Sequence, residues 1–205
     1  MNTFQVAWPI SALVLLVVAW GIGKAANGSA LGILIDDRGR HSLTHFQTVL
    51  WTITILSSLV AVFVARGFDA SSLVIPRELL GLMGVSAGSA VLSTAVKATK
   101  DALGSRAAVA FDGREVVRFD GSKDTIRAKL SQIWLQEEGD QADHVVSITK
   151  FQNFVFTLVV FVAYVGIAWR TSGLPSLPDN VVWLIGISHA GYVGGKVPDA
   201  GTKHH

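Results

Sequence analysis

Several groups of residues in this chain carry side chains that could do chemistry. Gly84-Val85-Ser86-Ala87-Gly88 matches the Gly-x-Ser-x-Gly pattern of serine hydrolases, in which a histidine activates the serine for attack on a carbonyl. That chemistry needs a strained strand-to-helix turn and an orienting acid, whereas Ser86 lies in an apolar stretch without carboxylates. We therefore predict that the chain is not an enzyme.

His189 is a titratable side chain inside an apolar stretch. An ionisable group at membrane depth favours a functional role, such as gating a pathway with pH or polarising a permeating ion. A neutral imidazole could equally bond a backbone carbonyl of the next helix. Both interpretations stay open, and the pore-lining candidates are Ser86, Ser89, Ser188 and His189.

Two pairs of carboxylates recur in the chain. Paired carboxylates beside glycines could hold Ca²⁺ or Mg²⁺, although neither loop has the ordered spacing of an EF-hand. The alternative is a solvated acidic turn that pairs with Arg38 and Arg40. We predict no cofactor and no metal, and retain as weak metal candidates Asp36, Asp37, Glu137 and Glu138.

The elements that position these residues form an internal repeat. Ser42-Leu43-Thr44-His45-Phe46-Gln47 recurs as Ser147-Ile148-Thr149-Lys150-Phe151-Gln152, and an apolar run follows each copy. Each copy then passes a proline turn into a second run that contains Gly-Val-Ser or Gly-Ile-Ser. Repeats decide folds, so we predict two copies of one two-helix unit.

Each copy also contains Thr-x-x-Gln, the pattern of a helix capping box. The alternative places the two glutamines in a water-lined path or a helix interface. The residues concerned are Thr44, Gln47, Thr149 and Gln152.

The composition is that of a membrane protein. Half of the residues are hydrophobic and 16% are charged, and the apolar residues gather in blocks. Crossing about 30 Å of hydrocarbon takes about 20 helical residues. Five runs approach that length: Phe4 to Ile22, Phe46 to Ala65, Leu79 to Val96, Phe151 to Trp169 and the short Val181 to Gly195.

The predicted fold is therefore an all-α integral membrane protein with five transmembrane helices. An N-terminal helix (1–30) precedes a first repeat (31–97), a cytoplasmic insertion (98–133) and a second repeat (134–197), and the tail (198–205) resembles the start of an affinity tag. Around Asp112-Gly113 the insertion favours a β-hairpin, followed by an amphipathic helix that carries Ile126, Leu130, Ile133 and Trp134 on one face.

The second helix of each copy is rich in small residues. Such faces let helices approach closely in lipid, so we expect these helices to be the inner ones and the first helices to face lipid. The packing candidates are Gly81, Gly84, Gly88, Gly186, Ala190 and Gly194.

Basic residues divide unevenly between the two sides of the predicted membrane. Fourteen lie with the first loop, the insertion and the C-terminus, and three (Arg66, Arg77 and Arg170) lie opposite. The positive-inside rule then puts the N-terminus outside, and the C-terminus and the large loop in the cytoplasm. The net charge of +2 is too small to indicate a nucleic-acid partner.

The phrases Ser-Leu-Thr-His-Phe-Gln, Leu-Met-Gly-Val-Ser and Leu-Ile-Gly-Ile-Ser-His-Ala-Gly-Tyr resemble a family of bacterial integral membrane proteins built from one repeated two-helix unit. The resemblance covers both repeats and leaves out the insertion. It implies location in a bacterial inner membrane and brings no activity or ligand with it.

Two copies of a two-helix unit lie parallel, related by a twofold axis along the membrane normal. A subunit of this size encloses no wide path alone, so we predict a homo-oligomer in the bilayer. The first function that we predict is a channel or pore for ions or small solutes, regulated through the cytoplasmic loop. The alternative is a non-transporting scaffold that docks a cytoplasmic or membrane protein partner.

Overall fold

The computed structural model describes residues 1–36, 38–69, 71, 73–102, 111–112, 115–117, 123–124, 128–137 and 143–194. Five α-helices dominate this part of the chain: α1 (Thr3–Asn27), α2 (Leu43–Ala65), α3 (Arg77–Ala102), α4 (Ile148–Thr171) and α5 (Asp179–Gly194). Two 3₁₀ turns precede the hairpins, η1 (Gly32–Leu34) and η3 (Leu130–Ile133). The all-α class predicted from the sequence is confirmed.

Among the described residues, four helices (α1 to α4) are long and apolar enough to cross a membrane. They are consistent with a multi-pass membrane protein. Helix α5 has 16 residues, which is fewer than the roughly 20 that a perpendicular span needs.

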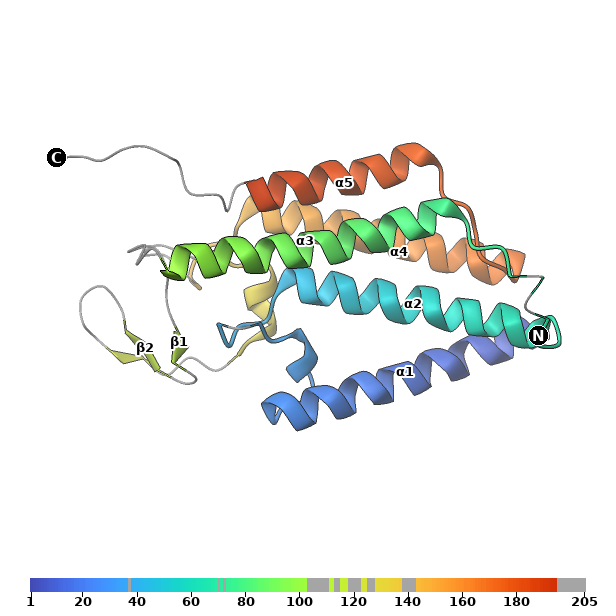
Figure 1. Cartoon of the computed structure of the whole chain (residues 1–205), viewed down its shortest axis with the longest axis horizontal. Helices are drawn as coiled ribbons and strands as arrows, with labels where there is room; N and C mark the ends of the chain where they lie inside the picture. The colour runs from blue at the N-terminus through green and yellow to red at the C-terminus, as the bar shows by residue number, and fades with distance from the viewer. Residues whose placement is uncertain are drawn as a thin grey trace.

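Figure 1 shows two helical hairpins, α2–α3 and α4–α5, that run in the same direction. Helix α2 packs against α4, and α3 packs against α5, so the corresponding members of the two hairpins contact each other. Helix α1 lies along α2 on the far side from α5. The bundle therefore has parallel hairpins, with α1 added at one side.

Helix α2 occupies the middle of the bundle. It contacts α1, α3 and α4, and its buried side chains include Trp51, which packs edge-on against Tyr164 of α4 with ring centroids 6.1 Å apart. This corrects the expectation that the first helices face lipid. The physical reason is α1, which covers the side of α2 that two hairpins alone would leave open.

Proline and cap residues fix where the helices begin. Pro76 and Pro178 directly precede α3 and α5, where a missing N–H costs nothing. The predicted capping box of Thr44 and Gln47 is corrected, because the N-cap residue of α2 is the extended Ser42, whose side chain makes no capping bond; its hydroxyl lies 2.8 Å from that of Thr44. Helix α4 likewise begins after Ser147, whose hydroxyl accepts from the Lys150 N–H at 3.5 Å.

Three short strands lie in the insertion, β1 (Phe111–Asp112), β2 (Glu115–Val117) and β3 (Lys123–Asp124), paired antiparallel in that order. These fragments fall short of the predicted hairpin, and most of the segments expected to form it lie outside the described residues. The amphipathic helix is corrected: residues 128–129 are not helical and Leu130–Ile133 forms only a 3₁₀ turn. The extended backbone of Lys129 before the turn and the antiparallel bridge between Leu135 and Val146 after it limit the turn to that length.

Candidate functional site

A buried polar stripe runs along one face of α3. Ser86, Ser89, Ser93 and Lys97 are all buried, with relative exposures between 2 and 6%. Their spacing of three, four and four residues places them on one side of the helix, one above the other. Two of these residues were singled out from the sequence, and the other two extend the stripe to the end of the membrane-length segment.

Ser89 and His189 form the central contact of this stripe. The His189 Nδ1 lies 2.7 Å from the Ser89 Oγ, and the bond joins α3 to α5. His189 is only 1% exposed, and within the described chain its Nε2 has no hydrogen-bond partner. A buried nitrogen without a partner is costly, so this position needs a group that the described residues do not supply.

A groove of about 410 Å³ lies between α3 and α5 beside this pair. Its lining residues are small or apolar apart from Ser89 and His189, and we call it the α3–α5 groove: Gly84, Val85, Gly88, Ser89, Leu92, Gly186, His189 and Ala190. Gly84 and Gly88 are exposed, and a Cβ built on either one would meet nothing within 4 Å. The glycine surface of α3 therefore points out of the bundle.

The remaining helix-packing candidates divide between contact and open surface. A Cβ on Gly81 would meet Val182 at 3.4 Å, and one on Gly186 would meet Val85 at 3.9 Å, so these two glycines lie where α3 and α5 touch. Ala190 and Gly194 are exposed.

Ser86 and Ser188 lie apart from the groove. The Ser86 carbonyl accepts a hydrogen bond from the Thr48 hydroxyl of α2 at 3.4 Å, and Ser188 is half-buried. Ser86 lies within α3 rather than on a strand-to-helix turn, and the histidine of α5 bonds to Ser89 instead. The structure thus brings together His189 and Ser89 among the four pore-lining candidates.

Gln47 connects the two first helices. Its Nε2 donates to the Asn153 Oδ1 at 3.0 Å and to the Thr157 Oγ1 at 2.6 Å, and all three residues are buried. Gln152, the repeat counterpart of Gln47, is exposed. The two glutamines therefore occupy different environments, because Gln47 faces α4 and Gln152 is exposed on the surface of the described bundle.

The carboxylates that precede the repeats belong to a buried ion-pair network, which we call the clasp. The Lys97 ammonium pairs with Asp36 and lies 3.6 Å from Glu137. The Lys150 ammonium lies 2.7 Å from the other Glu137 oxygen, and all four side chains are at most 7% exposed. Charges from both hairpins are thereby compensated in one cluster at the end of the bundle.

A second ion pair and a glutamine complete this end. Arg40 contacts both oxygens of Asp143, at 2.5 and 3.0 Å, and is 2% exposed. The side-chain Oε1 of Gln132 accepts from the His41 backbone N–H at 3.2 Å. The backbone carbonyl of Gln132 accepts from the Lys150 ammonium at 3.3 Å. Burial lowers the pKa of His41 below 6.5, partly opposed by a Lys129 backbone contact and by the Asp36 charge.

Lysine ammonium groups contact the two weak metal candidates that the structure describes. Asp36 and Glu137 face Lys97 and Lys150, whose positive charge disfavours a second cation in the same place. Asp37 and Glu138 lie outside the described residues. Sequence reasoning placed arginines against these acids and missed the lysines, because Lys97 is 61 residues from Asp36.

No protein-family model, curated protein or solved structure matched this chain in the comparisons.

Proposed function

We propose that the chain is a non-transporting membrane scaffold that assembles with further copies of itself through the α3–α5 groove. The observation that carries this proposal is the outward-facing surface of the groove, where Gly84 and Gly88 are exposed and a Cβ on either one would meet nothing within 4 Å.

The surface around the groove suits contact between helices. Gly84, Gly88 and Ala190 leave the backbones of α3 and α5 accessible, and small residues allow close approach between helices in lipid. Large apolar side chains flank them, since Leu92 is 57% and Ile187 is 68% exposed. Such a surface offers van der Waals contact on both sides of one buried polar atom.

The finer features of the assembly belong to the same proposal. Helix α5 is a fifth, shorter span, and the two hairpins descend from a duplicated unit. The clasp lies on the cytoplasmic side of a bacterial inner membrane, as the distribution of basic residues favours. The insertion at 98–133, on that side, is available to a cytoplasmic protein partner.

The number of subunits tests this proposal. Gly88→Leu fills the groove, while Gly166→Leu adds the same side chain to an exposed site of α4 where nothing lies within 4 Å. Single-molecule photobleaching of labelled protein in lipid nanodiscs should show oligomers for the wild type and Gly166→Leu, and monomers for Gly88→Leu. A monomeric wild type would overturn the proposal.

A pore is the second candidate function, and the α3 polar stripe is the observation that favours it. In a pore the stripe would have to face water, whereas Ser86 and Ser89 lie against α2 and α5. Ion flux into liposomes distinguishes the two candidates. The scaffold predicts no flux above that of protein-free vesicles, and flux that His189→Ala changes would support the pore.

A further inference from the structure

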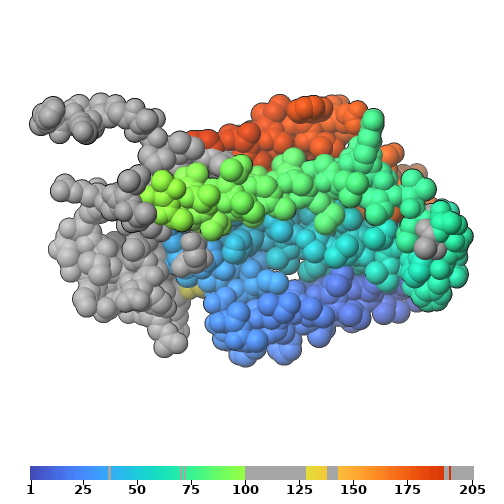
Figure 2. Space-filling view, viewed as in Figure 1, coloured from blue at the N-terminus to red at the C-terminus, as the bar shows by residue number. Residues whose placement is uncertain are grey.

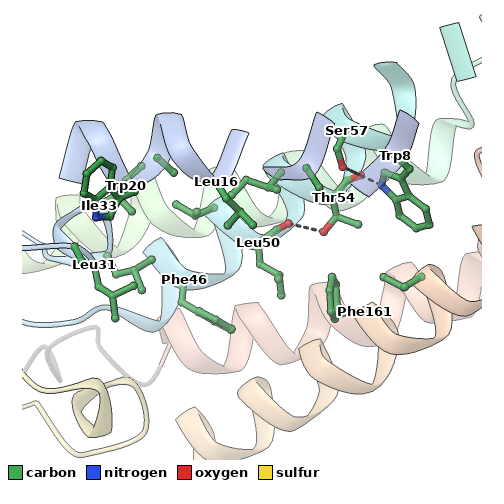
Figure 3. Close-up of a pocket in the computed structure, with 17 residues that line it drawn as sticks. Trp8, Leu16, Trp20, Leu31, Ile33, Phe46, Leu50, Thr54, Ser57 and Phe161 are labelled. Carbon is green, nitrogen blue, oxygen red and sulfur yellow. Dashed lines mark hydrogen bonds between the residues drawn. The ribbon is translucent and has the colours of Figure 1, made fainter. Parts of the chain in front are cut away.

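A second cavity, of about 520 Å³, lies between α1, η1, α2 and α4 (Figure 3). It is separate from the α3–α5 groove and shares no lining residue with it. The side chains drawn in Figure 3 come from α1, the segment around η1, α2 and α4, and those of α1 extend from Trp8 to Trp20. The cavity therefore runs lengthwise beneath α1.

Helix α1 is attached to the bundle at two separate places. Near its start, the Trp8 Nε1 donates to the Ser57 Oγ at 2.9 Å, and the Ser11 hydroxyl donates to the Ser57 carbonyl at 2.9 Å. Near its end, the backbones of Gly23 and Gly32 touch, since a Cβ on Gly32 would lie 2.2 Å from the Gly23 oxygen. These two attachments hold α1 in place along the cavity.

Between the attachments, α1 presents a stripe of small and aliphatic residues to the cavity. Ala12, Leu16 and Ala19 continue the helical face that begins at Trp8. Two alanines in that face are too short to reach α2, and the opposite wall is formed by residues such as Leu50 and Phe161. The short side chains of α1 account for the elongated space.

The hydroxyl protons in the cavity wall are already donated to carbonyl groups of the protein. The Thr54 hydroxyl donates to the Leu50 carbonyl at 2.7 Å, and the Ser57 hydroxyl donates to the Thr54 carbonyl at 3.1 Å. Trp8 is already bonded to Ser57. A cavity lined in this way favours an apolar occupant over water.

A positive charge lies beyond one end of the cavity. Lys24 is exposed in the last turn of α1, one turn past Trp20, a lining residue that is 53% exposed. Its ammonium donates one hydrogen bond, to the Gly28 carbonyl at 3.0 Å, and an ammonium has three donors. Tryptophan and lysine at a helix end are typical of the headgroup region of a bilayer.

We propose that this cavity binds one acyl chain of an anionic phospholipid, whose headgroup phosphate lies against Lys24. The apolar wall favours the acyl chain, and the lysine favours a negatively charged headgroup. The bound lipid fills the space between α1 and the α2–α4 pair and so becomes part of the packing of α1. This site is independent of self-assembly at the α3–α5 groove.

Native mass spectrometry of the full chain tests the proposal. The protein is reconstituted in vesicles of phosphatidylcholine and phosphatidylglycerol at three to one and then extracted in mild detergent. We expect one retained lipid per chain, enriched in phosphatidylglycerol over the vesicle ratio. Ala12→Phe and, independently, Ala19→Phe fill the cavity and should abolish the retention of lipid. Val14→Phe, at an exposed position outside the cavity, should leave the retention of lipid unchanged.

Lys24→Gln tests recognition of the lipid headgroup separately from binding of the acyl chain. Losing one lysine near an anionic surface should reduce the enrichment in phosphatidylglycerol about fivefold while the lipid itself is retained. Circular dichroism identifies any filled variant that fails to fold, and the two fillers give independent trials. The proposal is overturned if the wild type retains no lipid, if folded Ala12→Phe or Ala19→Phe retains as much as Val14→Phe, or if Lys24→Gln leaves the enrichment unchanged. A second copy of the chain at this site would appear as a dimer that Ala12→Phe dissociates, which also overturns it.

Discussion

The Nδ1 of His189 in α5 lies 2.7 Å from the hydroxyl of Ser89 in α3, and this buried contact joins the two hairpins of the bundle. Only one ring nitrogen takes part, because the Nε2 has no partner in the described chain. The histidine therefore joins α3 and α5 through one ring nitrogen, while the other is buried without a partner among the described residues. The space-filling view shows α3 and α5 lying side by side along the length of the bundle (Figure 2).

Replacing Ser89 with alanine should destabilise the bundle. Ser89→Ala leaves a second imidazole nitrogen buried without a partner, and we expect a loss of about 1–2 kcal/mol in the free energy of unfolding. Ser188→Ala is the matched control, since Ser188 is half-buried on the same helix as His189, and it should cost less than about 0.5 kcal/mol. Unfolding in mixed micelles measures both. Equal losses for the two variants would show that the Ser89–His189 contact contributes nothing.

The clasp should make Glu137 one of the most sensitive positions in the chain. Glu137→Gln removes the carboxylate that lies near both Lys97 and Lys150 and leaves buried positive charge uncompensated. Breaking a buried ion pair in this way costs about 3–5 kcal/mol. Glu78→Gln changes an acid whose arginine partner is 83% exposed and should cost less than about 1 kcal/mol. Thermal unfolding in detergent compares them, and a Glu137→Gln protein as stable as Glu78→Gln contradicts the clasp.

The glycine contact between α1 and η1 predicts a contrast among glycines. Gly32→Ala places a Cβ 2.2 Å from the Gly23 oxygen, so α1 or η1 has to move, and we expect a loss of more than about 2 kcal/mol. Gly21→Ala lies in the same helix region with nothing within 4 Å and should raise helix stability by up to about 1 kcal/mol. Melting temperatures of the two variants should therefore shift in opposite directions, and a neutral Gly32→Ala is incompatible with the close backbone contact.

Acid should weaken the end of the bundle that contains the clasp. Burial lowers the pKa of His41, so the folded chain binds the proton more weakly than the unfolded chain does. Stability is then fully present above about pH 6.5 and decreases as the pH falls toward the lowered pKa, by at most about 1.4 kcal/mol per pH unit for one group. Melting temperatures between pH 8 and 5 measure this decrease. His41→Gln should flatten the profile relative to the exposed-site control His144→Gln, and identical profiles would exclude His41 as the cause.

Much of the fold could be predicted from the sequence, because membrane helices depend on local features such as apolar runs and prolines. Apolar runs gave the helices, and Pro76 and Pro178 marked the starts of α3 and α5. The fifth run, Val181 to Gly195, is short in the sequence, and the described part of α5 has 16 residues. Length and hydropathy predict a helix more securely than they predict a span.

What the sequence could not provide is which face of a helix meets which neighbour. Gln47 and Gln152 occur in the same phrase, yet one is buried against α4 and the other is exposed. Trp8 lies near the start of an apolar run, yet its side chain is only 6% exposed and is bonded to Ser57. The first outcome depends on the packing of α2 against α4, and the second on α1, which lies outside the repeat.

The candidate site was partly predictable for the same reason. His189 and Ser89 were singled out because polar residues are rare in apolar helices, and the structure brings them into contact. The clasp was missed because its members come from four separate segments of the chain. Lys97 in particular is at the end of an apolar run, where an exposed, interfacial lysine is the ordinary expectation.

Cysteine cross-linking tests self-assembly through the α3–α5 groove most directly, because the chain contains no cysteine of its own. A disulfide requires Cβ atoms about 3.5–4.5 Å apart, so only residues that meet between copies will react efficiently. In native membranes under oxidising conditions, Gly88→Cys should give a cross-linked dimer and Gly166→Cys should remain monomeric. If Gly88→Cys stays monomeric, or if both variants cross-link to the same extent, the groove is not the surface through which copies of this chain assemble.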